Sequence, residues 1–278
     1  MNALGLLPAL GFLGLGLLTG AFGTLIGAGG GFVLMPVLLL IFPHEDPALL
    51  TSISLAVVFV NAASGTQAYA AMHRVDYKSG VAFALAGIPG AVLGALSTTI
   101  FPRAVFDTIF GAIFTCGAVF IALGRIEDRP KAFSKSHGLT WRRLVDSEGQ
   151  AYEYAFSMPL GVTLAAFIGV LSSFLGIGGG IIHVPVMVYA LGFPVHVATA
   201  TSHFVLAVMA LAGTITHIAS GEFTAGVHRT LYLSLGVLAG AQIGAHLSNH
   251  MRGRVIMRGL ALALALLGLR ILYLGITG

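Results

Sequence analysis

The sequence predicts an all-α, multi-pass membrane protein made of two inverted repeats, each with about five transmembrane segments. Three observations carry this prediction: an apolar composition, a series of apolar segments, and a glycine-rich motif that occurs twice. The chain of 278 residues is 57% hydrophobic and only 9% charged, whereas a soluble domain has about 25% charged residues. So few charged side chains cannot cover a soluble surface of this size, so we expect lipid to surround most of the protein.

Apolar segments long enough to cross a membrane recur along the whole chain. A helix needs about 20 apolar residues to cross a bilayer. The candidates are 4–22, 48–72, 79–100, 104–124, 158–175, 197–219, 227–248 and 255–276. No Lys or Arg precedes the first of them, so it is predicted to be a retained helix rather than a signal peptide. Two shorter segments, 31–42 and 180–193, each contain a proline and are expected to be short tilted helices, broken helices or re-entrant hairpins.

The glycine-rich motif marks the repeat. Gly27-Ala28-Gly29-Gly30-Gly31 recurs 149 residues later as Gly176-Ile177-Gly178-Gly179-Gly180, and a proline follows each copy at the same spacing. At an offset of 150 residues, Thr51-Ser52 matches Thr201-Ser202 and Thr66-Gln67 matches Thr216-His217. Interrupted segments at corresponding points of a duplicated chain point to the binding site of a transporter.

The distribution of Lys and Arg favours ten crossings. If all ten segments cross, one side of the membrane holds 11 of the 14 Lys and Arg residues, and the other holds Arg103, Arg229 and Arg270. If the two short segments re-enter, the sides hold nine and four, and Arg270, within the last segment, is assigned to neither. With ten crossings, the positive-inside rule places the central polar segment in the cytoplasm and both termini outside. The predicted units are a first membrane repeat (1–124), a cytoplasmic linker (125–157) and a second membrane repeat (158–278), inverted because each half has an odd number of crossings.

Two copies of the G-x-G-G-G-x-x-x-x-P phrase, each followed by Thr-Ser at the head of the next helix, resemble the TauE/SafE sulfite exporter family. This family is also called the 4-toluene sulfonate uptake permease family. The resemblance covers about 5–124 and 158–276, and it includes His217-x-x-x-Gly221. It implies a secondary transporter in the cytoplasmic membrane for a small sulfur oxyanion or organosulfonate, such as sulfite, sulfoacetate or a taurine-type compound.

The middle of the apolar segments holds no Asp or Glu, which argues against a cation carrier. It holds no Lys or Arg either, so neutral groups would have to bind an anion. A helix that begins inside the membrane offers unpaired amides and a partial charge of about +0.5, and glycine lets its backbone approach an oxyanion. The alternative role for the glycines is tight helix packing. The predicted substrate-binding residues are Gly29, Gly30, Gly31, Thr51, Ser52, Asn61, Gln67, Gly178, Gly179, Gly180, Thr201, Ser202, His203 and His217.

Three histidines, His183, His203 and His217, lie in apolar segments of the second half. His203 and His217 are 14 residues apart, so they share one face of a helix. Because histidine titrates near neutral pH, these two are the candidates for proton coupling. A purely structural hydrogen-bonding role is the alternative for each, and for His183 it is the favoured one.

Three functional classes remain to be weighed. The first is a transporter that works by alternating access, and the second is an anion channel whose half-helices form a filter. The third, a metalloenzyme built on the three histidines, is disfavoured because their spacing matches no standard metal motif and no acid accompanies them. The glycine motifs also lack the features of a nucleotide-binding loop. The sequence therefore predicts no enzymatic activity, no cofactor, no metal and no nucleic-acid partner, and it indicates no oligomeric state.

Overall fold

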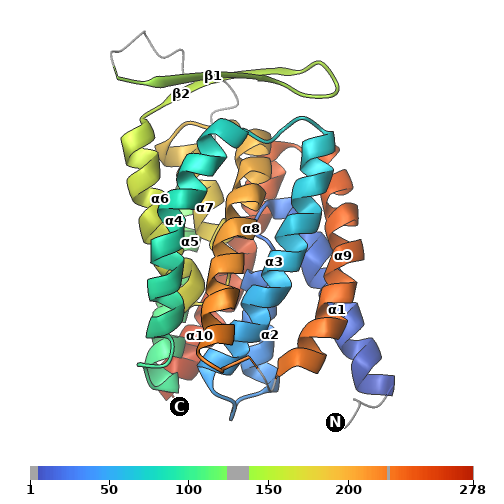
Figure 1. Cartoon of the computed structure of the whole chain (residues 1–278), viewed down its shortest axis with the longest axis vertical. Helices are drawn as coiled ribbons and strands as arrows, with labels where there is room; N and C mark the ends of the chain where they lie inside the picture. Colours follow the sequence, from blue (N-terminus) through green and yellow to red (C-terminus); the bar gives the residue numbers. More distant parts are fainter. Residues whose placement is uncertain (1–5, 124–137, 224–225, 278) are drawn as a thin grey trace.

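The computed structural model describes residues 6–123, 138–223 and 226–277, which form a helical bundle with a two-stranded hairpin across one end (Figure 1). The helices of the first half are α1 (Leu6–Ile26), α2 (Gly31–Ile41), α3 (Pro47–Ala71), α4 (Tyr77–Ser97) and α5 (Arg103–Leu123). Those of the second half are α6 (Met158–Phe174), α7 (Gly180–Pro185) with the π-helical turn η1 (Val186–Ala190), α8 (Val195–Ala219), α9 (Val227–Asn249) and α10 (Gly253–Thr277). Within the described residues, seven helices are long and apolar enough to cross a membrane, and three apolar helices are shorter.

The ends of the helices follow from local chemistry. Asp46 caps α3 by accepting from the amide of Ala48 at 2.8 Å, and Pro47 opens that helix, a position that tolerates proline. Asp76 caps α4 in the same way. In contrast, α2 and α7 begin after left-handed glycines, Gly30 and Gly179, and no side chain caps them. The two short helices therefore start with uncapped amides.

The two short helices turn back inside the bundle. The loops that precede α2 and α7 both contact Val58 and Leu206, which lie near the middle of α3 and α8. Phe42, just after α2, stacks on Phe12 of α1 at 6.4 Å, so α1 and α2 enter and leave by the same end. The pair α6 and α7–η1 enters from the hairpin end (Figure 1). Each short segment therefore returns toward the end from which the preceding helix enters, and the turn between the two is buried.

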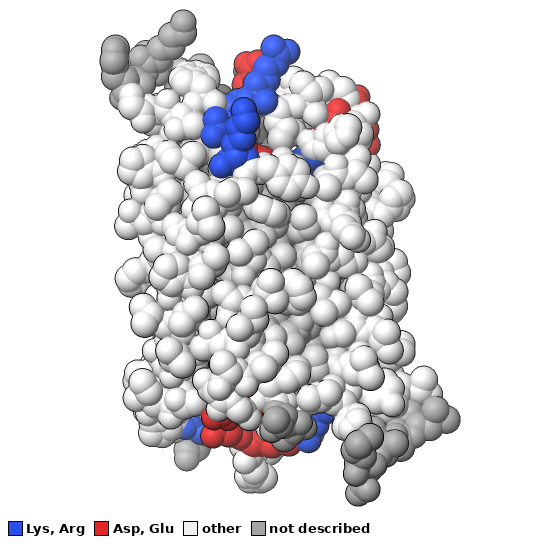
Figure 2. Space-filling view, viewed as in Figure 1, with Lys and Arg blue, Asp and Glu red and all other residues white. Residues whose placement is uncertain are grey.

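Close glycine contacts hold the helices together. Gly236, Gly240 and Gly244 of α9 lie against the backbone of α1, and Gly90 and Gly94 of α4 lie against α6. Helices α3 and α8 pack together, as do α5 and α10. This is the small-residue packing of membrane helices. The side of the bundle in view is almost free of charge, and the charged residues gather at its two ends (Figure 2).

The all-α prediction is wrong for the linker, which contains two β-strands. Residues Thr140–Val145 (β1) and Ala151–Phe156 (β2) form an antiparallel hairpin, in which Thr140 pairs with Phe156 and Val145 with Ala151. Tyr154 and Phe156 are buried and pack against Phe193. The sequence predicts only a connector here, because the segment is long and polar and carries charges of both signs. Residues 124–137, with Arg125, Arg129, Lys131 and Lys135, lie outside the described part of the chain.

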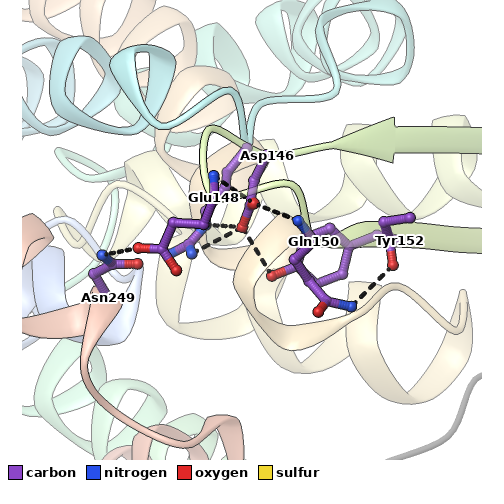
Figure 3. A network of polar contacts seen from close by, with 7 residues as sticks. Asp146, Glu148, Gln150, Tyr152 and Asn249 are labelled. Atoms are coloured by element: carbon purple, nitrogen blue, oxygen red, sulfur yellow. Dashed lines mark hydrogen bonds and ion pairs between the residues drawn. The ribbon is translucent and has the colours of Figure 1, made fainter.

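A polar network ties the hairpin to both halves, and Figure 3 shows its part between the hairpin turn and Asn249. The turn residue Asp146 accepts from Arg74 after α3, and Glu148 accepts from Asn249 at the end of α9 at 2.7 Å. Tyr154 donates to Asp76 at 2.8 Å, and the amide of Asp76 donates to Thr201 of α8 at 2.9 Å. These bonds hold the hairpin over the ends of α3, α4, α8 and α9.

Candidate functional site

The two glycine loops touch at the centre of the bundle. A Cβ atom on Gly31 would lie 2.7 Å from the carbonyl oxygen of Ile177, and one on Gly180 would lie 2.7 Å from the Cα atom of Ala28. Both distances are shorter than real Cβ contacts, so glycine is required at these positions. The tight packing expected as the alternative role of the motifs is therefore present, and it places the starts of α2 and α7 next to each other.

The loops make reciprocal contacts with the long central helices. Gly27 lies against Thr199 of α8, and Gly176 lies against Thr51 of α3. Gly65 likewise faces His203 and Thr24, whereas Gly213 faces Leu55 and Ser173. In each of these two pairs of corresponding contacts, the residue of α8 lies 148 residues after its counterpart in α3: Thr199 corresponds to Thr51, and Gly213 to Gly65.

A buried polar group lies beside the first loop. The hydroxyl of Thr24 donates to Oδ1 of Asn61 at 3.3 Å, and Nε2 of His203 lies 3.2 Å from the same hydroxyl oxygen. Tyr69 donates to the carbonyl oxygen of Thr24 at 2.7 Å and meets the His203 ring edge-on at 5.4 Å. These four residues come from α1, α3 and α8, and each is at most 1% exposed. We call them the Thr24 cluster.

One donor of the Thr24 cluster has no protein partner. The amide nitrogen Nδ2 of Asn61 is buried and makes no hydrogen bond. It lies next to Gly30, the residue before α2, because a Cβ atom on that glycine would be 3.5 Å from it. Within the described residues, no hydrogen bond uses the amides of Gly31 and Phe32 at the start of α2. Three donors therefore lie near one loop without a protein acceptor.

The polar side chains beside the second loop are all hydroxyls. Ser54 donates to the carbonyl oxygen of Gly176 at 2.6 Å, while the hydroxyls of Thr51, Ser172 and Ser173 are buried without a partner. The amides of Gly180 and Ile181 also lack a hydrogen bond among the described residues. The two sides of the centre therefore differ in chemistry.

The structure brings together only part of the predicted site. The six motif glycines, Asn61 and His203 meet at the centre, and Thr51 lies beside the second loop. Ser202 is buried on α8, and its hydroxyl has no partner.

Four predicted site residues and the further candidate His183 lie in other surroundings. Thr201 accepts from the amide of Asp76 near the hairpin, Ser52 donates to Leu49 within its own helix, and Gln67 is exposed. His217 is 1% exposed near the end of α8, with Nε2 unpaired. His183 packs against the ring of Phe83.

Sequence reasoning missed Thr24, Tyr69 and Ser173. A signal for two of them exists, because Thr24 and Ser173 each stand three residues before the first glycine of a motif. No comparable signal marks Tyr69, which the helix geometry alone brings to the carbonyl of Thr24. Within the described residues, no group of three His, Cys, Asp or Glu side chains is arranged to hold a metal ion.

Comparison with known proteins assigns the chain to a family. A family model described as sulfite exporter TauE/SafE matches residues 12–271. The chain belongs to the TauE/SafE family. It is therefore a multi-pass membrane transporter and not an enzyme.

Relatives of this TauE/SafE protein carry names that agree. The probable membrane transporter protein YunE of Bacillus subtilis is 32% identical over 271 residues, which cover 94% of this chain and 96% of the relative. A probable membrane transporter protein of Methanocaldococcus jannaschii is 25% identical and covers 73% of this chain and 70% of its own. One from Xylella fastidiosa is 28% identical over 66% of this chain and 63% of its own. No solved structure matches the chain.

Proposed function

We propose that the protein is a secondary transporter that moves a small sulfur-containing anion, such as sulfite or an organosulfonate, across the cytoplasmic membrane by alternating access. The observation that carries the proposal is the pair of uncapped helix starts that meet at the centre of the bundle. Such helix starts attract anions through free amides and the helix dipole. The helices around the centre, α1–α3 and α6–α8, contain no Lys, Arg, Asp or Glu, and the face in view in Figure 2 carries its charges at the two ends. Neutral donors would therefore bind the anion.

The packing supports two inverted repeats. Helix α1 packs on α9 while α6 packs on α4, and α3 and α8 exchange the same kind of contact with the opposite loop. A two-fold axis in the membrane plane would produce this exchange. The same contacts pair Thr51 with Thr199 rather than with Thr201, because the offset for the central helices is 148 residues.

The hairpin end is proposed to face the cytoplasm. The described Lys and Arg residues at this end are Arg74, Lys78, Arg142, Arg143, Arg252, Arg254 and Arg258. The opposite end has Arg103, Arg229 and Arg270, so the positive-inside rule favours this orientation. An inside-negative potential would then favour anion export by about 2.3 kcal/mol per charge per 100 mV, and uptake would need coupling. His203, in contact with the Thr24 cluster's hydroxyl, is the first candidate for a coupling proton, and His217 is the second.

The test combines binding with transport. Purified protein is screened for thermal stabilisation by sulfite, sulfate, thiosulfate, sulfoacetate, taurine and simple carboxylates, and compact sulfur oxyanions are expected to stabilise it most. In proteoliposomes, a carrier shows saturable flux and counterflow of labelled substrate. Steady single-channel currents without counterflow would instead indicate the anion channel. If no anion stabilises the protein or crosses the membrane, the proposed function is wrong.

A further inference from the structure

We infer that the protein has one asymmetric anion site, formed by the start of α2 together with Asn61 and Thr24, and that the corresponding place in the second half does not bind the anion. This inference deepens the proposed function and rests on it. It assigns a role to Thr24, and it predicts that only the first of the two glycine loops binds the anion.

The first step is the direction of the hydrogen bonds in the Thr24 cluster. The Thr24 hydroxyl donates its only proton to Oδ1 of Asn61, so its oxygen is left to accept from Nε2 of His203 at 3.2 Å. With Oδ1 engaged, the amide group of Asn61 is held with Nδ2 toward Gly30. Thr24 and His203 therefore fix the orientation of the donor that would touch the anion.

The second step is the cost of leaving that donor unused. Asn61 is fully buried and its Nδ2 has no protein partner. A buried donor without an acceptor costs about 1–3 kcal/mol, so such a group normally has a partner that the protein alone does not supply. The amides of Gly31 and Phe32 are unpaired in the same region of the described chain. All three donors suit one acceptor group with several oxygens.

The third step is the comparison of the two halves. Gly65 of α3 contacts His203 and Thr24, whereas its counterpart in the second half, Gly213 of α8, contacts Leu55 and Ser173. Met209 stands 148 residues after Asn61, so a thioether replaces the amide. Leu55 and Met209 belong to the apolar packing of the bundle. The second half therefore lacks an amide held in one orientation, although its loop has the same glycines. Its unpaired side-chain groups are hydroxyls, and that of Ser172 lies beside Gly179. A hydroxyl can rotate and can donate or accept, so its proton is not directed at the loop.

The ligand chemistry follows from these donors. They are neutral and they come from one helix start and one side-chain amide. The helices around them, α1, α2, α3 and α8, contain no Lys, Arg, Asp or Glu. A compact oxyanion head group such as sulfite or a sulfonate can accept from all three at once. Sulfite and methanesulfonate are suitable probes, because they share three oxygens on sulfur and differ in charge and in one methyl group.

The experiment measures anion binding to the full-length protein in detergent by isothermal titration, with thermal unfolding of each unliganded variant as a check on folding. Asn61→Leu and Thr24→Val are each expected to weaken binding about 10- to 100-fold, the range for a hydrogen bond to a charged group. Thr24→Ser, which keeps the hydroxyl, should bind within about threefold of the wild type. The matched controls in the second half, Met209→Leu and Ser173→Ala, should leave affinity within about twofold.

The outcomes separate this inference from the proposed function. One anion per chain, lost in the Asn61 and Thr24 variants alone, supports the asymmetric site. Two anions per chain, or equal losses from Ser173→Ala, would overturn it while leaving the transporter proposal intact. A wild-type protein that binds neither probe would overturn both. If Asn61→Leu does not fold, the comparison of Thr24→Val with Thr24→Ser decides the result.

Discussion

Arg74 donates two hydrogen bonds to one carboxylate oxygen of Asp146, from Nε at 3.1 Å and from Nη2 at 2.9 Å. The two side chains are 5% and 0% exposed. The other oxygen of Asp146 accepts from the amides of Glu148 and Gln150, both at 3.0 Å. Because Arg74 follows α3 and Asp146 lies in the hairpin turn, this ion pair fastens the hairpin to the first half of the bundle.

Breaking this ion pair should destabilise the protein. Asp146→Ala leaves a buried guanidinium without its partner, a change that costs about 3–5 kcal/mol, and the thermal unfolding midpoint should fall accordingly. The control is Glu153→Ala, which removes the ion pair between Arg143 and Glu153 on the same hairpin. Those side chains are 71% and 62% exposed, so little change is expected. Equal effects from both variants would contradict the fastening role of Arg74 and Asp146.

The same ion pair predicts a dependence of stability on pH. Burial acts to raise the pKa of the Asp146 carboxyl, but hydrogen bonds from Arg74 and from the amides of Gln150 and Glu148 outweigh it and hold the pKa below its usual value. A carboxyl with a lowered folded-state pKa adds stability above its unfolded pKa of about 3.9, and this stability is lost as the pH falls through the folded value.

The measurement compares wild type with Asp146→Asn across pH. The difference in unfolding midpoint should be constant between about pH 5 and 7 and should shrink below about pH 4. A difference that shrank between pH 6 and 9 would show that a group other than this carboxyl controls it.

The sequence predicted most helix bounds closely because hydropathy and caps act locally. The segment 48–72 appears as Pro47–Ala71, where Asp46 supplies the cap. The depth of the glycine turns could not be read in this way, since it depends on contacts with Val58 and Leu206 from distant helices. The hairpin was missed because a short amphipathic alternation within a charged linker carries little signal.

The candidate site was predictable only where a motif marked it. The glycines of both loops are predicted because the motif is repeated. The offset between α3 and α8 is 148 residues, whereas that between the loops is 149, so the sequence pairs Thr51 with Thr201 although the structure pairs it with Thr199. Gln67 is predicted to belong to the site because it is a polar amide in an apolar segment, but the sequence does not show that it lies on the exposed face of α3.

Glycine substitutions should separate the central contact from ordinary helix packing. Gly31→Ala and Gly180→Ala each place a methyl group against the backbone of the other loop, and overpacking of this kind costs about 1–3 kcal/mol or more. Gly14→Ala and Gly259→Ala meet nothing within 4 Å and should stabilise their helices by up to about 1 kcal/mol. Thermal unfolding and the yield of monodisperse protein measure both effects. The contact between the loops would be refuted if all four variants behaved alike.

Proton coupling through His203 predicts a specific change in transport. His203 is buried against Thr24 and Tyr69, and no ion pair of the described residues includes it, so its protonation would be felt directly at the Thr24 cluster. His203→Gln keeps a donor for Thr24 but cannot carry a proton at physiological pH. In proteoliposomes, this variant should still exchange labelled substrate by counterflow, yet an imposed pH gradient should no longer accelerate uptake.

Two other histidine variants complete that experiment. His183 packs on Phe83 away from Thr24, so His183→Gln should keep the wild-type response to the gradient. His217 is buried with an unpaired Nε2, and His217→Gln tests the second candidate under the same conditions. If His203→Gln and His217→Gln both retain the wild-type pH profile, the histidines of α8 do not couple transport to protons, and the remaining explanation for net flux is the membrane potential acting on the anion's own charge.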